Sequence, residues 1–308
     1  MSSIKIEAIA AKRLGEIERL LGRWEGAAER AAPAIGVQRA NLVNAAVDTA
    51  RLAGCGCSLQ QAVAVLRGKP NLTSAGDILT LQNAHAAYLR AASWDPMQSD
   101  DLLDAHGVLL KGASGDAGRF KNAQGMRELF RWLRQDDELP PIIAAVTFHC
   151  ELRRMRPFSA GNGRVARLWQ HVLLRRVSPL FEHAPTESVL WEHHKQYEAA
   201  LAASRRSPTA GAASAVANAA PFVEHMLDML LLALQRLGGQ LHARAETADD
   251  RKAKARKALA KSWFSRKQYR GLFPTLSTAS ASRDLAQAVA AGRLVSRGAH
   301  ALTEYRFR

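Results

Sequence analysis

The stretch "RMRPFSAGNGRVAR", residues 154–167, is the part of the sequence that decides the fold. Pro157 cannot continue a helix, and the residue before a proline is pushed toward extended backbone, so a helix must end near Met155. A flexible Gly-Asn-Gly turn then leads into a second helix, whose first turn carries Arg164 with Arg167 one turn later. Free N–H groups and the helix dipole make such an N-terminus favourable for an anion. The stretch therefore predicts a helix-loop-helix anion site.

Residues 3–246 are rich in Ala and Leu at helical spacing and show few of the alternations typical of strands. Breaks that contain Gly or Pro divide this part into separate helices. Pro140-Pro141 begins the helix that ends near Met155. The fold class is therefore mainly α, with a helical bundle around the anion site. The charged connector 246–257 separates this bundle from a small C-terminal domain.

The sequence argues against a membrane-spanning protein and against a secreted protein. No apolar run reaches the length of a membrane span, and the N-terminal residues lack the apolar core and cleavage site of a signal peptide. Cys55, Cys57 and Cys150 have no metal-ligand spacing, so we expect reduced thiols and no metal site. The sequence therefore indicates a cytoplasmic protein without a membrane partner.

The positive charge of the chain is unevenly distributed. The whole chain has a formal charge of +15, and residues 251–308 hold fourteen Lys and Arg against two acidic residues, a net charge of +12. Such an asymmetry favours a polyanionic partner, with duplex DNA first. A solvated basic face is the alternative.

The same basic segment predicts two helices followed by a hairpin. Ser277 is a suitable N-cap for the second helix, Gly292 ends it, and alternating apolar residues follow. This order resembles a small α+β winged helix, which implies DNA contacts from the second helix and from the hairpin. The candidate DNA-binding residues are Thr278, Ser280, Ser282, Arg283, Arg297 and His300. A winged helix that contacts proteins is the alternative.

The segment "RPFSAGNGRVAR" resembles the signature of the Fic (Fido) proteins, His-x-Phe-x-Asp/Glu-Gly-Asn-Gly-Arg-x-x-Arg. The matching positions, which the resemblance implies bind the nucleotide together with Arg156, are Phe158, Gly161, Asn162, Gly163, Arg164 and Arg167. "AGRFKN" and "QYEAAL" resemble flanking segments, and the second places Tyr197 near a nucleotide base. The resemblance covers roughly residues 78–235 and implies a Fic-type bundle that transfers AMP, or a related phosphate-containing group, to a protein hydroxyl. The expected domains are residues 1–77, a Fic domain over 78–246 and the winged helix over 251–308.

The sequence departs from this family at the positions that carry its chemistry. Arg156 stands where the family has its His base, and a guanidinium has no lone pair with which to take a proton. Ala160 stands where the family has the acidic metal ligand, and a methyl group cannot bind Mg²⁺. The segment between Phe120 and Phe130 is too short for the family's β-hairpin flap. His149 is the nearest other candidate base, but its place on a helix core face favours a structural role.

A further feature of many Fic proteins is a Ser/Thr-x-x-x-Glu segment whose Glu pairs with the second signature arginine. Ser3 and Glu7 have this spacing, so the resemblance implies an inhibitory contact between Glu7 and Arg167. An ordinary helix N-cap at Ser3 is the alternative, although a capping box uses a spacing of three.

These features support three hypotheses of function. The first is a Fic protein that keeps its phosphate site on Arg156, Arg164 and Arg167, has impaired AMP transfer and acts as a DNA-binding regulator; ATP is the candidate ligand, and magnesium is doubtful. The second is an active protein adenylyltransferase with altered chemistry. The third is an interaction scaffold. A homo-oligomer is compatible with all three.

Overall fold

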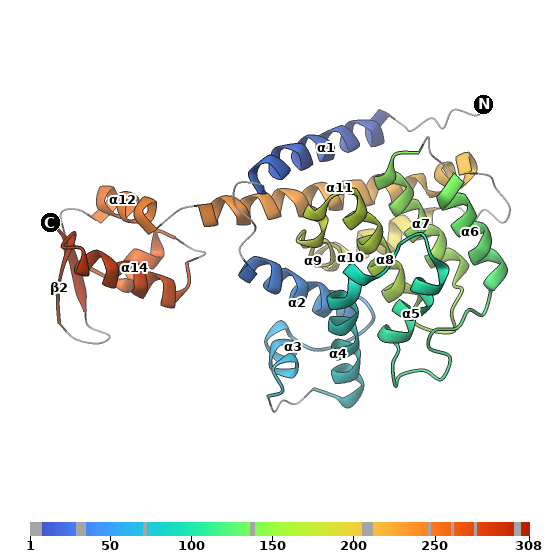
Figure 1. The fold of residues 1–308 in the computed structure, drawn as a ribbon, viewed down its shortest axis with the longest axis horizontal. Coiled ribbons are helices and arrows are strands. Elements are labelled where there is room, and N and C mark those ends of the chain that lie inside the picture. The colour runs from blue at the N-terminus through green and yellow to red at the C-terminus, as the bar shows by residue number, and fades with distance from the viewer. Residues whose placement is uncertain are drawn as a thin grey trace. The chain divides into compact units, whose positions relative to one another are not determined.

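The computed structural model describes residues 8–28, 35–69, 73–135, 139–204, 212–245, 248–259, 262–273, 276–298 and 303–308. The chain divides into two compact units, Met1–Gly238 and Gly239–Arg308. The first is helical, and the second combines helices with a small sheet (Figure 1). The predicted mainly α fold class is confirmed.

The N-terminal unit consists of helices connected by short loops and by two 3-10 turns. The elements are α1 (Ala8–Ala28), α2 (Ile35–Arg51), α3 (Leu59–Leu66), α4 (Ala75–Arg90), η1 (Ala91–Ser93), α5 (Ser99–Leu109), α6 (Ala123–Gln135), α7 (Pro141–Met155), α8 (Asn162–Val177), η2 (Pro179–Glu182), α9 (Thr186–Glu192), α10 (His194–Ala203) and α11 (Ala212–Ala245), which extends into the second unit. Helix α7 packs against α8 and α6 (Figure 1). Helix α2, from the predicted N-terminal region, packs against α4 and α9.

Helix α7 has the limits that the prolines predict. Pro141 occupies its first turn, where the missing N–H costs nothing, and the helix ends at Met155. The expected extended backbone before Pro157 is wrong, because Arg156 has φ 48° and ψ 59° in the left-handed region. Its N–H bonds the carbonyl of Leu152 at 3.1 Å, which closes the last turn as an αL cap. The cap turns the chain sharply into the loop.

The C-terminal unit has the order helix, strand, two helices, two strands. Its elements are α12 (Ala248–Leu259), β1 (Phe264–Ser265), α13 (Arg266–Gly271), α14 (Thr278–Ala290), β2 (Leu294–Arg297) and β3 (Glu304–Phe307). The strands form an antiparallel sheet in the order β1-β3-β2, with Phe264 opposite Tyr305. Ser277 accepts the N–H of Ser280 and caps α14, as predicted. Phe264, just before α13, pairs in the sheet, and its ring is buried in the core.

A buried ion pair joins α12 to α14 within this unit. Arg251 donates from Nε and Nη2 to the two carboxylate oxygens of Asp284, at 2.7 and 3.0 Å, and the Tyr269 hydroxyl donates to the same carboxylate at 3.2 Å. The side chains of Arg251 and Asp284 are only 15% and 6% exposed. A fragment that starts at residue 251 therefore lacks the first residues of α12 next to this pair. A fragment of the C-terminal unit should instead start at residue 239, the first residue of that unit.

We expect Asp284→Ala to destabilise the C-terminal unit by about 3 kcal/mol, because it leaves two buried donors without their acceptor. Hydrogen exchange of the full chain measures this as faster exchange confined to the C-terminal unit. Glu304→Ala is the control, since it breaks the more exposed Arg297–Glu304 pair and costs about 1 kcal/mol or less. Equal exchange in the two variants would contradict the expectation.

No described helix combines the length and apolar character needed to cross a membrane.

Candidate anion-binding site

The loop between α7 and α8 is held by the side chain of Asn162. Its Oδ1 accepts the N–H of Phe158 at 3.0 Å, and its Nδ2 donates to the carbonyl of Phe158 at 2.9 Å. Gly161 has φ 74°, and a Cβ there would lie 2.5 Å from a methyl carbon of Leu110. The sequence therefore needs glycine at this position for both conformation and space. Asn162, which the sequence placed among the ligand-binding residues, has both amide atoms bound to the loop backbone.

His106 supports this loop from α5, and the sequence analysis did not identify it. Its Nδ1 accepts the N–H of Gly118 at 2.9 Å, which leaves Nε2 to donate to the carbonyl of Ala160 at 3.0 Å. Its ring stacks on Phe158 with the centroids 3.7 Å apart. Burial lowers the pKa of His106, which favours the neutral ring, and both nitrogens are used in holding the loop. No motif marks this residue in the sequence, because both of its partners are backbone groups distant along the chain.

A cavity of about 520 Å³ lies at the N-terminus of α8; we call it the anion cavity. Its charged lining consists of arginines from the end of α7 and the start of α8, and among the described residues no Asp, Glu or His lines it. The lining residues are Leu52, Ala53, Arg153, Arg156, Ser159, Ala160, Gly161, Asn162, Gly163, Arg164, Arg167 and Leu201. The three arginines that the sequence assigned to one phosphate therefore line the same cavity.

These arginines are not equally available to a ligand. Arg153 forms two bonds with the carboxylate of Glu198, at 2.9 and 3.0 Å. Arg156 is exposed, and within the described part of the chain its side chain has no hydrogen bond or ion pair. Arg164 has its Nη1 buried without a partner, and burial, together with the charge of Arg167, lowers its pKa. Arg156 and Arg164 are therefore the two lining arginines that have unpaired hydrogen-bond donors within the described chain.

Arg167 has a different environment, because it is only 2% exposed. Its Nε donates to the hydroxyl of Thr49 at 2.8 Å, and its Nη2 donates to the carbonyl of Thr49 at 3.0 Å. Ser3 and Glu7, the predicted inhibitory pair, lie outside the described residues. Thr49 and Ala53 have the same spacing of four and are followed by Gly54. Thr49 to Ala53 thus has the spacing of the Ser/Thr-x-x-x-Glu pattern, with Ala in place of Glu, and this spacing is the sequence signal for the segment.

Two of the predicted ligand contacts have buried side chains. Tyr197 is fully buried; its hydroxyl lies 2.9 Å from Nε2 of His149, and its ring lies 5.8 Å beneath the guanidinium of Arg153. Phe158 is 1% exposed and stacks on His106. A nucleotide base cannot stack on either ring without displacing other groups, because both rings are already covered. The structure thus places both rings beneath the site, where they support it.

His149 is not a base for reactions in the anion cavity. It is fully buried, with Nδ1 at 2.6 Å from Oε1 of Gln170 and Nε2 bonded to Tyr197. Burial lowers its pKa to about 3. This environment agrees with the structural role that the sequence predicts for His149.

The loop that precedes α6 is short, as the sequence predicts. Only Lys121 and Asn122 separate Phe120 from α6, and their backbone N–H groups donate to the carbonyl of Pro157 at 2.7 and 3.4 Å. No hairpin lies between Phe120 and α6 in this fully described segment. The edge of the anion loop is therefore covered by a short turn in place of a flap.

The fold and this loop are similar to those of Fic family proteins. Residues 96–174 match the family model Fic/DOC family. The crystal structure of a Fic family protein from Desulfovibrio desulfuricans G20 has a TM-score of 0.72 at 24% identity, with 99% of this chain and 97% of that chain covered. Fic-1 (residues 134–508) from C. elegans has a TM-score of 0.59 at 20% identity, with 77% of this chain and 74% of that chain covered. A Fic domain-containing signaling protein from Bacteroides thetaiotaomicron VPI-5482 has a TM-score of 0.55 at 15% identity, with 76% of this chain and 97% of that chain covered. The comparison with curated proteins gives no match.

Proposed function

We propose that this chain binds the phosphate groups of a nucleotide in the anion cavity and has lost efficient AMP transfer. The observation that carries the proposal is a cavity whose described lining has four arginines and no acidic residue. Two of these arginines lack partners in the described chain. Phosphate oxygens would supply the missing acceptors, and the N-terminus of α8 would add its dipole. Arg156 cannot act as the base that Fic proteins have at this position, and Ala160 cannot act as their metal ligand.

The residues of the cavity do not fit a protein-held magnesium ion. Mg²⁺ is bound in proteins through carboxylates, and the acidic family position is Ala160. Arg156 would instead supply positive charge to the phosphates. Binding should therefore not require magnesium, and no step of the function is assigned to a metal.

Ala53 is the residue that keeps the cavity open to an anion. It lines the cavity four residues after Thr49, which holds Arg167. A carboxylate at this position would face the arginines and compete with phosphate. The absence of a carboxylate at this position supports a site at which the α2 segment does not compete with nucleotides.

We expect ATP to bind without magnesium, and Arg164→Ala to weaken it about tenfold or more through the loss of charge-assisted hydrogen bonds. Ala53→Glu should have a similar effect by occupying the arginines. Isothermal titration calorimetry with and without EDTA measures both. Arg131→Ala, an exposed cation on α6 outside the cavity lining, controls for net charge. Strict magnesium dependence, or no binding at millimolar ATP, would count against the proposal.

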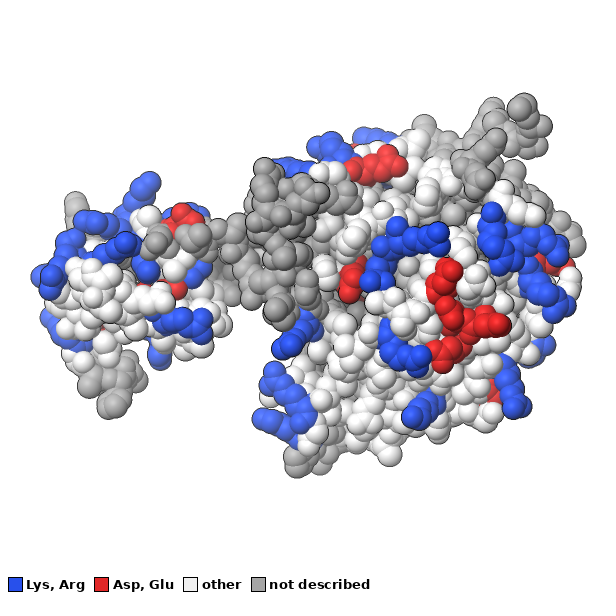
Figure 2. Space-filling view, viewed as in Figure 1, with Lys and Arg blue, Asp and Glu red and all other residues white. Residues whose placement is uncertain are grey.

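A second candidate function, duplex DNA binding by the C-terminal unit, would make the protein a regulator. Lys and Arg side chains cover much of the visible face of this unit, with few acidic ones among them (Figure 2). Lys267 on α13 and Arg283 on α14 are exposed and have no ion pair within the described chain. They are the best candidates for phosphate and base contacts.

The structure changes the expected role of some predicted DNA contacts. Arg297 forms two bonds with Glu304 and lies 4.2 Å from the centroid of the Trp263 ring, so its charge is already partnered. Ser282 accepts a bond from Arg266 at 3.0 Å. Thr278 and Arg283 are exposed, while Ser280 is half-buried and bonds Ser277. His300 lies outside the described residues. The recognition surface is therefore expected on α13 and α14 more than on the hairpin.

A further inference from the structure

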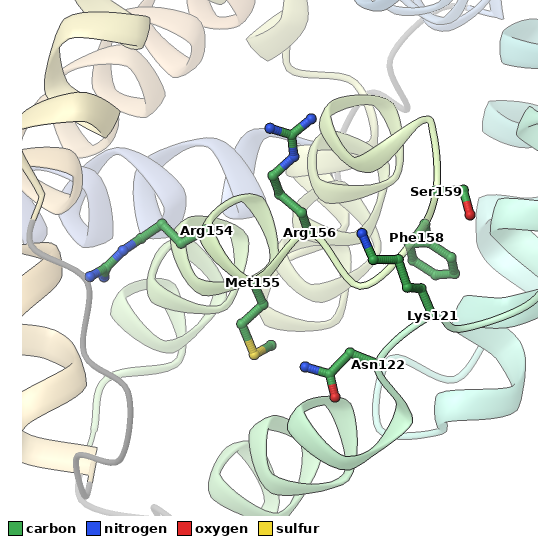
Figure 3. A pocket seen from close by; sticks show the side chains of 7 residues that line it. All are labelled: Lys121, Asn122, Arg154, Met155, Arg156, Phe158 and Ser159. Carbon is green, nitrogen blue, oxygen red and sulfur yellow. The ribbon is translucent and has the colours of Figure 1, made fainter.

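A second cavity, of about 420 Å³, adjoins the anion cavity; we call it the side cavity. Arg156 and Ser159 line both cavities. The side cavity lies between the loop that precedes α6 and the end of α7, and its residues are Lys121, Asn122, Arg154, Met155, Arg156, Phe158 and Ser159 (Figure 3). None of its described lining residues is acidic, so the same electrostatic argument applies to it.

Two of its cations are free to bind a ligand. Lys121 is exposed, and its side chain has no ion pair within the described chain; Arg156 is in the same condition. Arg154 points away from Lys121 and is bound to Glu151 at 2.6 Å (Figure 3). The position of Lys121 is fixed relative to the anion loop, because its N–H donates to the carbonyl of Pro157 at 2.7 Å. The backbone of Lys121 is therefore fixed beside the loop that follows Arg156, and the two side chains line the same cavity.

We infer that the side cavity binds a second phosphoryl group of the same ligand, so that the ligand class is a nucleotide with phosphoryl groups at two separate positions. This inference rests on the proposed function, because the first phosphoryl group must occupy the anion cavity. Lys121 and Arg156 hold the second group, and the Nδ2 group of Asn122 can donate a further hydrogen bond, because its Oδ1 already accepts the N–H of Gly125 at 3.1 Å.

The shared position of Arg156 favours one bridging ligand over two independent ones. Its planar guanidinium has five donors, enough to contact a phosphate on each side. A ligand anchored in the anion cavity presents its second group to Lys121 at high effective concentration, so the second contact adds affinity at little entropic cost. A nucleotide with a single 5′ phosphate chain leaves the Lys121 end of the side cavity unused.

Adenosine 3′,5′-bisphosphate and ADP provide the test, because both carry two phosphoryl groups on the same nucleoside. Titration calorimetry on the full chain should give about tenfold tighter binding of the bisphosphate. Lys121→Ala should remove that difference and leave ADP affinity nearly unchanged. Arg119→Ala is the matched control, since it is exposed two residues earlier, lines neither cavity and should change neither affinity.

The outcomes separate the two proposals. Equal binding of both nucleotides, or equal weakening of both by Lys121→Ala, overturns the inference and leaves the proposed function standing. A phosphoserine peptide that binds the ADP-saturated protein and is lost with Lys121→Ala would assign the side cavity to a protein partner and also overturn it. Binding of neither nucleotide means that the proposed function itself fails.

Discussion

The wild-type protein is expected to transfer no detectable AMP from labelled ATP and magnesium, whereas the double variant Arg156→His with Ala160→Asp is expected to show transfer. A positioned general base alone contributes about 10²–10⁴ in rate, and the acidic residue would restore a magnesium ligand beside the phosphates. The backbone suits the change, because Arg156 has φ 48° and His is among the residues enriched in that region. Ala160 is exposed, so a longer side chain there meets no packing barrier.

The measurement is incorporation of label into the protein itself and into added cell protein. Arg156→Ala with Ala160→Asp is the matched control, since it removes the same positive charge and restores the acid without supplying a base. Activity in the control equal to that of the His variant would show that Arg156 inhibits by charge alone. Strong labelling by the wild type, lost in Asn162→Ala, would contradict the proposed loss of transfer.

The helix-loop-helix at the anion site could be predicted from sequence because each of its limits depends on a local rule. Pro141 sets the start of α7, Pro157 forbids its continuation, and the glycines admit the turn. The conformation of Arg156 was not predictable in the same way. The preference for extended backbone before proline competes with the αL cap that closes α7, and only the packed structure decides between them.

The parts of the site that were missed depend on contacts between segments far apart in the chain. Thr49 reaches Arg167 across more than a hundred residues, and His106 reaches Ala160 across more than fifty. Neither contact has a periodic pattern or a short motif, so spacing along the sequence cannot reveal it. Tyr197 is a different case: a family position suggested a ligand contact, and the ring is buried with its hydroxyl 2.9 Å from Nε2 of His149.

The C-terminal unit is expected to bind duplex DNA with an affinity that falls log-linearly with salt. With about six phosphates neutralised, affinity should drop about a thousandfold between 50 and 200 mM salt. Fluorescence anisotropy with the full chain, and with a fragment that begins at residue 239 and keeps α12 whole, measures this slope. Because the proposed DNA contacts lie on α13 and α14, which both proteins contain, the two proteins should give similar salt slopes.

Two substitutions divide the DNA contacts by type. Lys267→Ala removes a phosphate contact and should weaken all duplexes alike, with the slope reduced by about one unit. Arg283→Ala, on exposed α14, should weaken a preferred site more than random DNA. Arg297→Ala is a weaker test than its exposure suggests, because it also breaks the pair with Glu304 and uncovers Trp263. If neither protein shifts any duplex at low salt, the exposed cations of α13 and α14 must serve protein contacts. The interaction-scaffold hypothesis then becomes the leading one, since only the partner class changes while the charged surface stays the same.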